Sequence, residues 1–316
     1  MDNLTHSLVG AVLGQMGLKR RTGLAMPTLI LAANLPDIDA GCAIYGVESL
    51  AMRRGLTHGP IALLVLPLLL WAAMLAFDAW QARRGKRPSG RLPVHKGWLL
   101  ALAYIGCLSH PALDWLNTYG IRLLEPFSHR WFYGDTLFII DLWIWIALGV
   151  SVWVSLRRER RGIAHSTRPA WIGFTAVCAY IFVNGAITGR AEAQAAELLR
   201  RSGQGGALVV ASPPPVRFWK RDIFWRGNGY YGSGAYSIGK GATVEPGRPT
   251  GMDDMWLRLW ARAEPAARAF LFWSRMPVAT PDGDAIMLVD QRFTQPLTRG
   301  SFTVRVKAPN PTSHSE

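Results

Sequence analysis

Cysteine is scarce in this 316-residue sequence, and histidine is missing from a long C-terminal stretch. The three cysteines, Cys42, Cys107 and Cys178, lie in or beside apolar segments and form neither a CxxC pair nor a disulfide framework. No histidine occurs between Ser166 and Ser313. We therefore expect no transition-metal site in the C-terminal part, and any metal chemistry should belong to the N-terminal part.

Acidic residues are also few, because 21 Asp and Glu stand against 35 Lys and Arg, a formal net charge of +14. Such an excess can favour binding to nucleic acid or to anionic lipid. Here many basic residues lie in short loops between apolar runs, which is the pattern of membrane topology. We therefore expect membrane lipids, and no nucleic acid, as partners. The first ten residues lack the basic region of a signal peptide, so the N-terminus is expected to be retained.

Long apolar runs are frequent before residue 190. Four of them have about the length needed to cross a bilayer, and two shorter ones precede these four. We predict a membrane α-helical bundle over residues 1–189, with about four full spans plus two short N-terminal apolar helices. The expected spans are Gly59–Phe77, Gly97–Leu113, Thr136–Leu156 and Pro169–Thr188, and the short helices are Leu4–Leu18 and Gly23–Leu35.

The basic loops indicate the orientation of this bundle. Lys and Arg gather in residues 19–21, 83–96 and 157–168, and placing all three loops in the cytoplasm gives a consistent alternation of helices. Arg53 and Arg54 do not fit this orientation, since it places these two basic residues outside the cytoplasm. The N-terminus and everything after Thr188 would then lie on the periplasmic side of a bacterial cytoplasmic membrane, making this a multi-pass protein.

After residue 190 the sequence is typical of a soluble, strand-rich domain. Short segments rich in Val, Phe, Tyr and Trp alternate with Gly, Pro and Asp. We predict a β-rich periplasmic domain over residues 190–316, reached through a helix at Ala191–Arg201 and containing a second helix at Gly251–Ala269 that Pro265 would break or kink. The expected strands are Ala207–Ala211, Val216–Trp225, Tyr230–Ile238, Phe270–Ser274, Ala285–Asp290 and Ser301–Lys307.

Ionisable residues in or beside membrane helices are costly and therefore indicate function. In this sequence they are histidines and aspartates, and the predicted topology places all of them at the outer membrane face. The candidates are His6, Asp37, Asp39, His58, His110 and Asp114, with Asp135 and Asp141 as a weaker pair and His129 as an additional candidate.

The spacing of these residues favours a metal site. His110 and Asp114 are spaced i, i+4, so they project from one face of a helix. Asp37 and Asp39 follow a proline and are two residues apart, so an extended backbone would direct both side chains the same way. Imidazole with carboxylate suits zinc, manganese or iron(II). Structural alternatives stay open: His6 could be a hydrogen-bonded interface residue, the two aspartates could cap the next segment, and His110 with Asp114 could be a paired helix surface.

Five segments together carry a family resemblance: Met1-Asp-Asn-Leu-Thr-His6, Asn34-Leu-Pro-Asp-Ile-Asp39, Arg54-Gly-Leu-Thr-His58, His110-Pro-Ala-Leu-Asp114 with Asn117-Thr-Tyr-Gly120, and Phe138-Ile-Ile-Asp141. In this order, over roughly residues 1–160, they resemble the bacterial membrane-bound metal-dependent hydrolase family, also called YdjM-like and formerly a domain of unknown function. The resemblance implies a hydrolase that needs a metal ion. In that family Asp141 is typically followed by proline, whereas Leu142 follows it here.

The order His, Asp, His, His-x-x-x-Asp is also similar to zinc-dependent phospholipase C and its nuclease relatives. This similarity implies that the ligands are His6, one of Asp37 and Asp39, His58, His110 and Asp114, and that Asp114 bridges two zinc ions. A further His-x-x-x-Glu site of those enzymes has no counterpart in this sequence. The expected cofactor is therefore one or two divalent ions, zinc or alternatively manganese.

These features predict a hydrolase whose site opens at the periplasmic face and acts on a phosphoester of a lipid or envelope precursor. Asp37 or Asp39 could be the general base. Arg54, Arg122 and Arg130 lie on the same side and could bind either a phosphate of the substrate or lipid headgroups.

Two other functions stay open. One is a membrane scaffold with a structural metal or ion-pair site and a partner-binding β-domain. The other is a transporter, which would need ionisable residues near the bilayer midplane rather than at helix ends and is therefore disfavoured.

Overall fold

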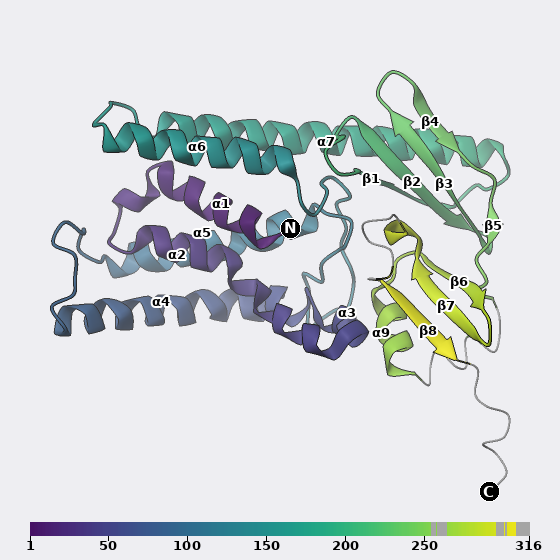
Figure 1. Cartoon of the computed structure of the whole chain (residues 1–316), viewed down its shortest axis with the longest axis horizontal. Helices are drawn as coiled ribbons and strands as arrows, with labels where there is room; N and C mark the ends of the chain where they lie inside the picture. The colour runs from purple at the N-terminus through teal and green to yellow at the C-terminus, as the bar shows by residue number, and fades with distance from the viewer. Residues whose placement is uncertain (254–256, 258–263, 295–299, 301, 308–316) are drawn as a thin grey trace, which may run out of the picture. The chain divides into compact units, whose positions relative to one another are not determined.

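The computed structural model describes residues 1–253, 257, 264–294, 300 and 302–307. They divide into two compact units. Unit 1 contains residues 1–39 and 54–185, and unit 2 contains residues 40–53 together with the described residues from 186 onward. Unit 1 is helical, and unit 2 carries the strands (Figure 1). A helical N-terminal region followed by a β-rich C-terminal region is therefore confirmed.

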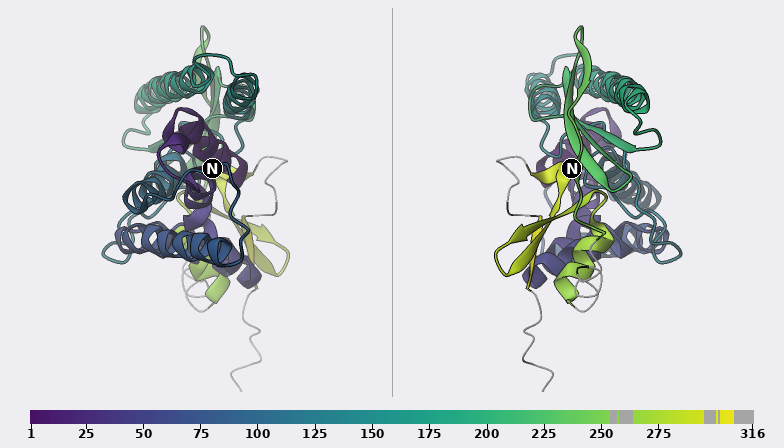
Figure 2. Two further views of the ribbon diagram at one scale, coloured as in Figure 1. Left: turned by 90° about the vertical axis from the view of Figure 1, so that its left-hand side faces the viewer. Right: turned by 90° about the vertical axis from the view of Figure 1, so that its right-hand side faces the viewer.

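Unit 1 is a bundle whose helices run alongside one another, as the end-on views in Figure 2 also show. Three 3₁₀ segments lie between these helices, and the second and longest of them continues into unit 2. The elements are α1 (Asn3–Gln15), η1 (Leu18–Arg20), α2 (Ala25–Asn34), η2 (Leu35–Glu48), η3 (Leu56–His58), α4 (Pro60–Arg83), α5 (Lys96–Trp115), α6 (Leu142–Arg160) and the first part of α7 (Arg168–Arg201).

Two helices among the described residues are long and apolar enough to cross a membrane, α4 and α7. They contain the predicted spans Gly59–Phe77, apart from its first residue, and Pro169–Thr188. Large apolar side chains such as Leu64 on α4 and Phe182 on α7 are exposed, as lipid-facing side chains are. The helices α5 and α6 do not reach the same length and apolarity, so the prediction of four full spans is not supported.

The start of α6 also differs from the predicted span Thr136–Leu156. The helix begins at Leu142 because the carboxylate of Asp141 accepts hydrogen bonds from the backbone N–H groups of Trp143 (3.0 Å) and Ile144 (3.1 Å). This is the geometry of a helix N-cap.

Small residues bring α1, α2 and α5 close together. A methyl group at Gly10 of α1 would lie 2.8 Å from the carbonyl oxygen of Leu29, and one at Gly106 of α5 would lie 2.7 Å from the Cβ atom of Ala32. Both distances are shorter than nonbonded atoms allow, so glycine permits the observed helix spacing. This packing places the polar ends of α2 and α5 side by side.

The basic loops of unit 1 lie together, away from these polar ends. Lys19 forms an ion pair with Glu159, which joins the first basic loop to the third. The backbone N–H of His95 donates to Thr22 Oγ1 (2.7 Å), which joins the first loop to the second. The three loops that the charge pattern assigns to one side of a membrane therefore lie at one end of the bundle.

Unit 2 contains two antiparallel sheets (Figure 1). The first has the strand order β1-β2-β3-β4, with β5 pairing with β3, and the second has the order β6-β7-β8. The elements are α3 (Ser49–Met52), β1 (Leu208–Ser212), β2 (Lys220–Gly227), β3 (Tyr230–Ser237), β4 (Gly241–Val244), β5 (Arg248–Pro249), α9 (Pro265–Trp273), β6 (Pro277–Asp282), β7 (Ala285–Asp290), η4 (Gln291–Phe293) and β8 (Thr303–Lys307).

The last part of α7 packs against the first sheet. Ile187 and Ala191 of this helix are buried with Ala211 and Ile223 of the strands. Because α7 is continuous from Arg168 to Arg201, the predicted helix at Ala191–Arg201 is the end of the same helix that forms the candidate span.

One predicted strand of this region is wrong. Phe270–Ser274 lies in α9 up to Trp273, because Ala267, Phe270 and Trp273 are buried at the three-residue spacing of a helix face. Pro265 occupies the first turn of α9, where proline is favoured, so it begins the helix rather than kinking it. Most of the predicted helix Gly251–Ala269 lies outside the described residues. The strands β4, β5 and β6 were not predicted.

Candidate metal centre

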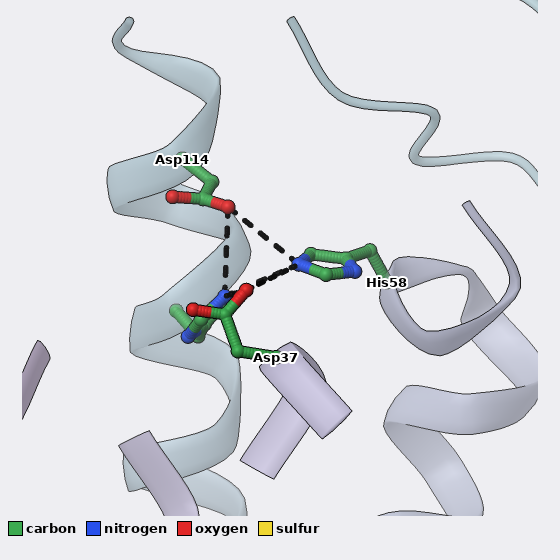
Figure 3. Close-up of side chains that lie close together, drawn as sticks. Asp37, His58 and Asp114 are labelled. Atoms are coloured by element: carbon green, nitrogen blue, oxygen red, sulfur yellow. Dashed lines mark hydrogen bonds and ion pairs between the residues drawn. The ribbon is translucent and has the colours of Figure 1, made fainter. Parts of the chain in front are cut away.

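Four ligand atoms from three segments of unit 1 lie within 4.8 Å of one another. Asp37 comes from η2, His58 from η3, and His110 and Asp114 from α5. Figure 3 shows that Asp37, His58 and Asp114 point toward one another. All four side chains are buried. The i, i+4 spacing on α5 therefore places an imidazole and a carboxylate at one point, where η2 and η3 add one group each.

The separations within this cluster suit a single ion. Nε2 of His58 lies 3.1 Å from Nε2 of His110, and Oδ2 of Asp114 lies 3.5 Å from both. Oδ1 of Asp37 lies 3.6 Å from Nε2 of His110 and 4.0 Å from Nε2 of His58. Ligand atoms about 2.0–2.1 Å from a tetrahedral ion lie roughly 3.3–3.4 Å from one another. The cluster therefore has about the size of a site for one divalent metal ion.

Neighbouring groups fix which nitrogen of each ring faces the cluster. Nδ1 of His110 lies 2.7 Å from the carbonyl oxygen of Ala33, which can only accept, so Nδ1 carries the proton. Nδ1 of His58 lies 2.9 Å from Thr57 Oγ1, whose own hydroxyl donates to Asp39 Oδ2 (2.9 Å). Both Nε2 lone pairs therefore point into the cluster beside two carboxylates. Such a buried collection of electron-rich atoms is stabilised by a cation, and ligand histidines held this way are typical of metal sites.

The protonation states of Asp37 and His58, which lie outside the two candidate spans, agree with this arrangement. Burial lowers the pKa of His58 well below its ordinary value, so the ring is neutral at neutral pH. Burial raises the pKa of Asp37, but the interactions with His110 and Arg54 outweigh this effect and lower the pKa to about 2. Neutral imidazole and ionised carboxylate are the forms that bind metal ions.

Asp39 lies behind His58 and is not one of the four groups. Its Oδ2 accepts hydrogen bonds from the backbone N–H of Arg54 (2.7 Å) and from Thr57, and it lies 3.5 Å from Nδ1 of His58. The expectation that Asp37 and Asp39 point the same way is wrong, because η2 is a 3₁₀ helix and not extended chain. With three residues per turn, side chains two positions apart diverge by about 120°.

His6 contacts the cluster from α1. Its ring stacks on that of His110, with centroids 3.8 Å apart and an interplanar angle of 15°. Nε2 of His6 lies 3.3 Å from Oδ1 of Asp114, which also forms a buried ion pair with the α-amino group of Met1. Neither ring nitrogen of His6 has a hydrogen-bond partner among the described residues. His6 therefore lies beside the four groups, on the opposite side of the Asp114 carboxylate.

Two buried arginines adjoin the cluster. Nε of Arg54 lies 3.0 Å from Oδ2 of Asp114, and Nη1 of Arg54 donates to Asn117 Oδ1 (2.9 Å). The backbone N–H of Arg122 donates to the carbonyl oxygen of Arg54 (2.9 Å), and the Arg122 guanidinium pairs with Glu125. The Arg54 guanidinium group therefore contacts a carboxylate of the cluster directly. The backbone of Arg122 is hydrogen-bonded to the backbone of Arg54.

The other predicted site residues lie outside the cluster. Arg130 is exposed, and the exposed His129 places its Nδ1 2.8 Å from Glu125 Oε1. Asp135 is buried in the loop before α6. Asp141 caps α6. None of these four residues belongs to the convergent set of ligand atoms in the part of the chain that the structure describes.

Sequence reasoning missed the groups that orient the ligands. Thr57 directly precedes His58, and this adjacency was a usable signal for the hydroxyl that contacts the ring. Glu125 is three residues after Arg122, a spacing that favours an ion pair on a turn. The role of the Ala33 carbonyl could not be predicted from the sequence. Every residue has a backbone carbonyl group, and only the fold determines which of these groups faces His110.

Comparison with known proteins agrees with the motifs. A family model described as YdjM inner membrane protein matches residues 1–191, more than half of the chain, and this range contains every residue of the cluster. No curated protein and no solved structure matches the chain. The similarity to zinc-dependent phospholipase C stays a prediction. The family resemblance of the sequence motifs is confirmed, and the chain belongs to the YdjM inner membrane protein family.

Proposed function

We propose that this protein is a membrane-bound metal-dependent hydrolase. The proposal is carried by one observation, the convergence of Asp37, His58, His110 and Asp114 in a buried cluster with the size of a single-ion site. Two imidazoles with two carboxylates suit zinc, with manganese as the alternative. On the other side of Asp114, His6 is the only histidine near Oδ1 among the described residues, so one ion is favoured over two.

The side chains at the cluster would have different roles in hydrolysis. A divalent ion at the cluster would supply Lewis acidity and lower the pKa of water there. His58 and His110 would hold it through Nε2 and Asp114 would hold it through Oδ2, which leaves Asp37 to act on the water. Asp37 is 9% exposed, whereas His58, His110 and Asp114 are fully buried. Asp37 is therefore the carboxylate best placed to accept a proton from water entering the site, and Asp39 is a positioning residue that orients His58.

A phosphoester of a lipid or envelope precursor is the proposed substrate class. Guanidinium groups bind phosphate oxygens through paired hydrogen bonds. Arg54 contacts Asp114, and Arg122 is tied to the backbone of Arg54, so a phosphate at the cluster would lie within reach of both groups. Arg130 is exposed, which suits contact with lipid headgroups better than a role in the buried site.

We further propose that the site opens on the periplasmic side and that the β-rich domain lies there. The basic loops of unit 1 support this, because Lys and Arg favour the cytoplasmic side and the cluster is away from them. In this multi-pass arrangement α4 runs inward from the site, and α7 runs outward.

The test uses the full-length protein purified in detergent. Bound metal is measured by mass spectrometry, and hydrolysis is measured with bis(p-nitrophenyl) phosphate. Wild type should bind a divalent transition metal and hydrolyse the ester until a chelator is added. His110→Ala should lose both properties, whereas His165→Asn, an exposed position in a basic loop, should keep both. If wild type binds no transition metal, the proposed function is wrong.

A structural site is the alternative function, and the surroundings of Asp114 favour it. This buried carboxylate pairs with groups from the N-terminus and Arg54, so the cluster could simply hold these segments together. Metal binding without hydrolysis of either the soluble diester or phospholipid vesicles would support a scaffold whose β-domain binds a partner. A transporter is disfavoured, because the cluster lies at the ends of α2 and α5.

A further inference from the structure

Unit 2 contains a cavity of about 290 Å³ lined by residues from both of its sheets. It is separate from the metal cluster, all of whose residues belong to unit 1. Its size is close to the lower end of the roughly 300–1,000 Å³ of small-molecule pockets. Its lining includes the side chains of Phe224, Tyr231, Ser233, Glu245, Val278 and Gln291.

One of the lining residues, Gln291, is largely buried and has a polar atom without a partner in the part of the chain that the structure describes. The side chain of Gln291 is 4% exposed, and its Nε2 donates to the carbonyl oxygen of Gly232 (2.5 Å). Its Oε1 is buried and has no hydrogen-bond partner among the described residues. A buried acceptor left unpaired costs about 1–3 kcal/mol. A ligand that donates a hydrogen bond here would recover that free energy.

Apolar side chains line the same cavity. Phe224 and Val278, from the two different sheets, are 6% and 4% exposed and line the same cavity as Gln291. The matching ligand group must therefore join an N–H or O–H donor to a small apolar part.

The mouth of the cavity is polar and carries both signs of charge. Ser233 Oγ donates to Glu245 Oε2 (2.5 Å), and the exposed Arg248 lies on the same rim. Opposite charges at one mouth favour a neutral ligand that carries several hydroxyl groups over an anion or a cation. The half-buried Tyr231 adds an aromatic ring to the wall, and aromatic rings pack against the C–H faces of sugars.

We propose that this cavity binds one ring of an N-acetylated amino sugar. The acetamido N–H donates to Gln291 Oε1, and the acetamido methyl packs against Phe224 and Val278. The ring hydroxyls bond to Ser233 and Glu245 at the mouth. The volume admits a single ring and excludes a folded protein segment.

The experiment uses full-length protein in a detergent without a sugar headgroup, and N-acetylglucosamine as the probe. Binding is followed by saturation-transfer NMR. We expect saturable binding in the millimolar range, and weaker binding of glucose, which has no acetamido N–H. Gln291→Met removes the acceptor at similar length and should weaken binding at least tenfold.

Because Gln291 also donates to Gly232, a second variant protects the test against loss of folding. Val289→Phe fills the cavity from β7 and leaves Gln291 in place; it should abolish binding without lowering the melting temperature. The metal content of unit 1 should not change in either variant, which separates this proposal from the proposed hydrolase. Equal affinity for glucose and N-acetylglucosamine, unchanged binding by Val289→Phe, or no saturable binding by wild type would overturn it.

Discussion

Asp114 is the residue on which the two sides of the candidate metal centre meet. Its Oδ2 faces the imidazoles of His58 and His110, and its Oδ1 faces His6. Arg54 also contacts Oδ2. A metal ligand and a purely structural ion pair would both need this carboxylate, so the two roles differ only in how stability responds to added metal.

Asp114→Asn distinguishes these roles. Asn keeps the shape and one oxygen but removes the charge, so metal affinity should fall by at least the 10–100-fold that changes near ligands cost. Metal at 100 times its dissociation constant stabilises a protein by about 2.7 kcal/mol, and the variant should lose most of that increment. The measurement is thermal unfolding of both proteins with chelator and with zinc. A scaffold held by ion pairs would instead show the same loss of roughly 3–5 kcal/mol with and without metal.

Asp141 is a second aspartate that the family motif singles out, and its contacts give it a different role. It accepts hydrogen bonds from two backbone N–H groups at the start of α6 and from the Tyr180 hydroxyl (3.0 Å). Asp141→Ala should therefore lower the free energy of unfolding by about 0.5–2 kcal/mol, the cost of losing an N-cap. Metal content should be unchanged by mass spectrometry. A variant that folds but loses its metal would make Asp141 part of the centre.

The participants of the cluster could be predicted from the sequence, but their orientations could not. His58, His110, Asp37 and Asp114 stand out because ionisable groups are rare at the ends of apolar helices. The separate roles of Asp37 and Asp39 depend on the 3₁₀ conformation of η2, and Leu35-Pro-Asp-Ile-Asp39 is equally compatible with extended chain.

At the scale of elements, the centre depends on how closely α2 and α5 pack. The carbonyl of Ala33, near the end of α2, holds the His110 ring of α5, so a shift between these helices moves a ligand. Gly106 lies one turn before His110 and faces Ala32, one residue before Ala33.

Gly106→Ala should therefore weaken metal binding without touching a ligand. The added methyl group would lie 2.7 Å from Ala32 Cβ, and such overpacking costs about 1–3 kcal/mol as the helices move apart. Gly149→Ala in α6 is the matched control, because a methyl group there meets nothing within 4 Å. Melting temperature and zinc affinity are measured for both variants. Equal zinc affinity in Gly106→Ala and wild type would show that the α2–α5 spacing does not control the site.

Helices were easier to predict than strands in this chain. The apolar runs of unit 1 are long, and their helical state follows because backbone groups within a membrane must bond internally. The mistaken strand Phe270–Ser274 is rich in aromatic residues, which favour strands in isolation, but burial of Phe270 and Trp273 on one face of α9 decides for a helix.

At the scale of the whole molecule, the basic loops lie apart from the cluster of candidate metal ligands. Basic loops 19–21, 83–96 and 157–168 lie at one end of unit 1, and the metal cluster lies away from them, where η2, η3 and the end of α5 meet. The charge pattern and the ligand positions are independent properties of the sequence. The proposed orientation, with the basic end in the cytoplasm, requires this agreement.

Reporter fusions test this orientation. Alkaline phosphatase, which is active only outside the cytoplasm, should be active when fused after Arg201 at the end of α7 and inactive after Arg87. Green fluorescent protein, which fluoresces only inside, should give the opposite pattern. The physical reason is that moving the Arg-rich loops across the membrane is disfavoured, whereas α4 and α7 can each cross it once. Phosphatase activity after Arg87 would invert the bundle and place the metal cluster on the cytoplasmic side, where the proposed periplasmic substrate could not reach it.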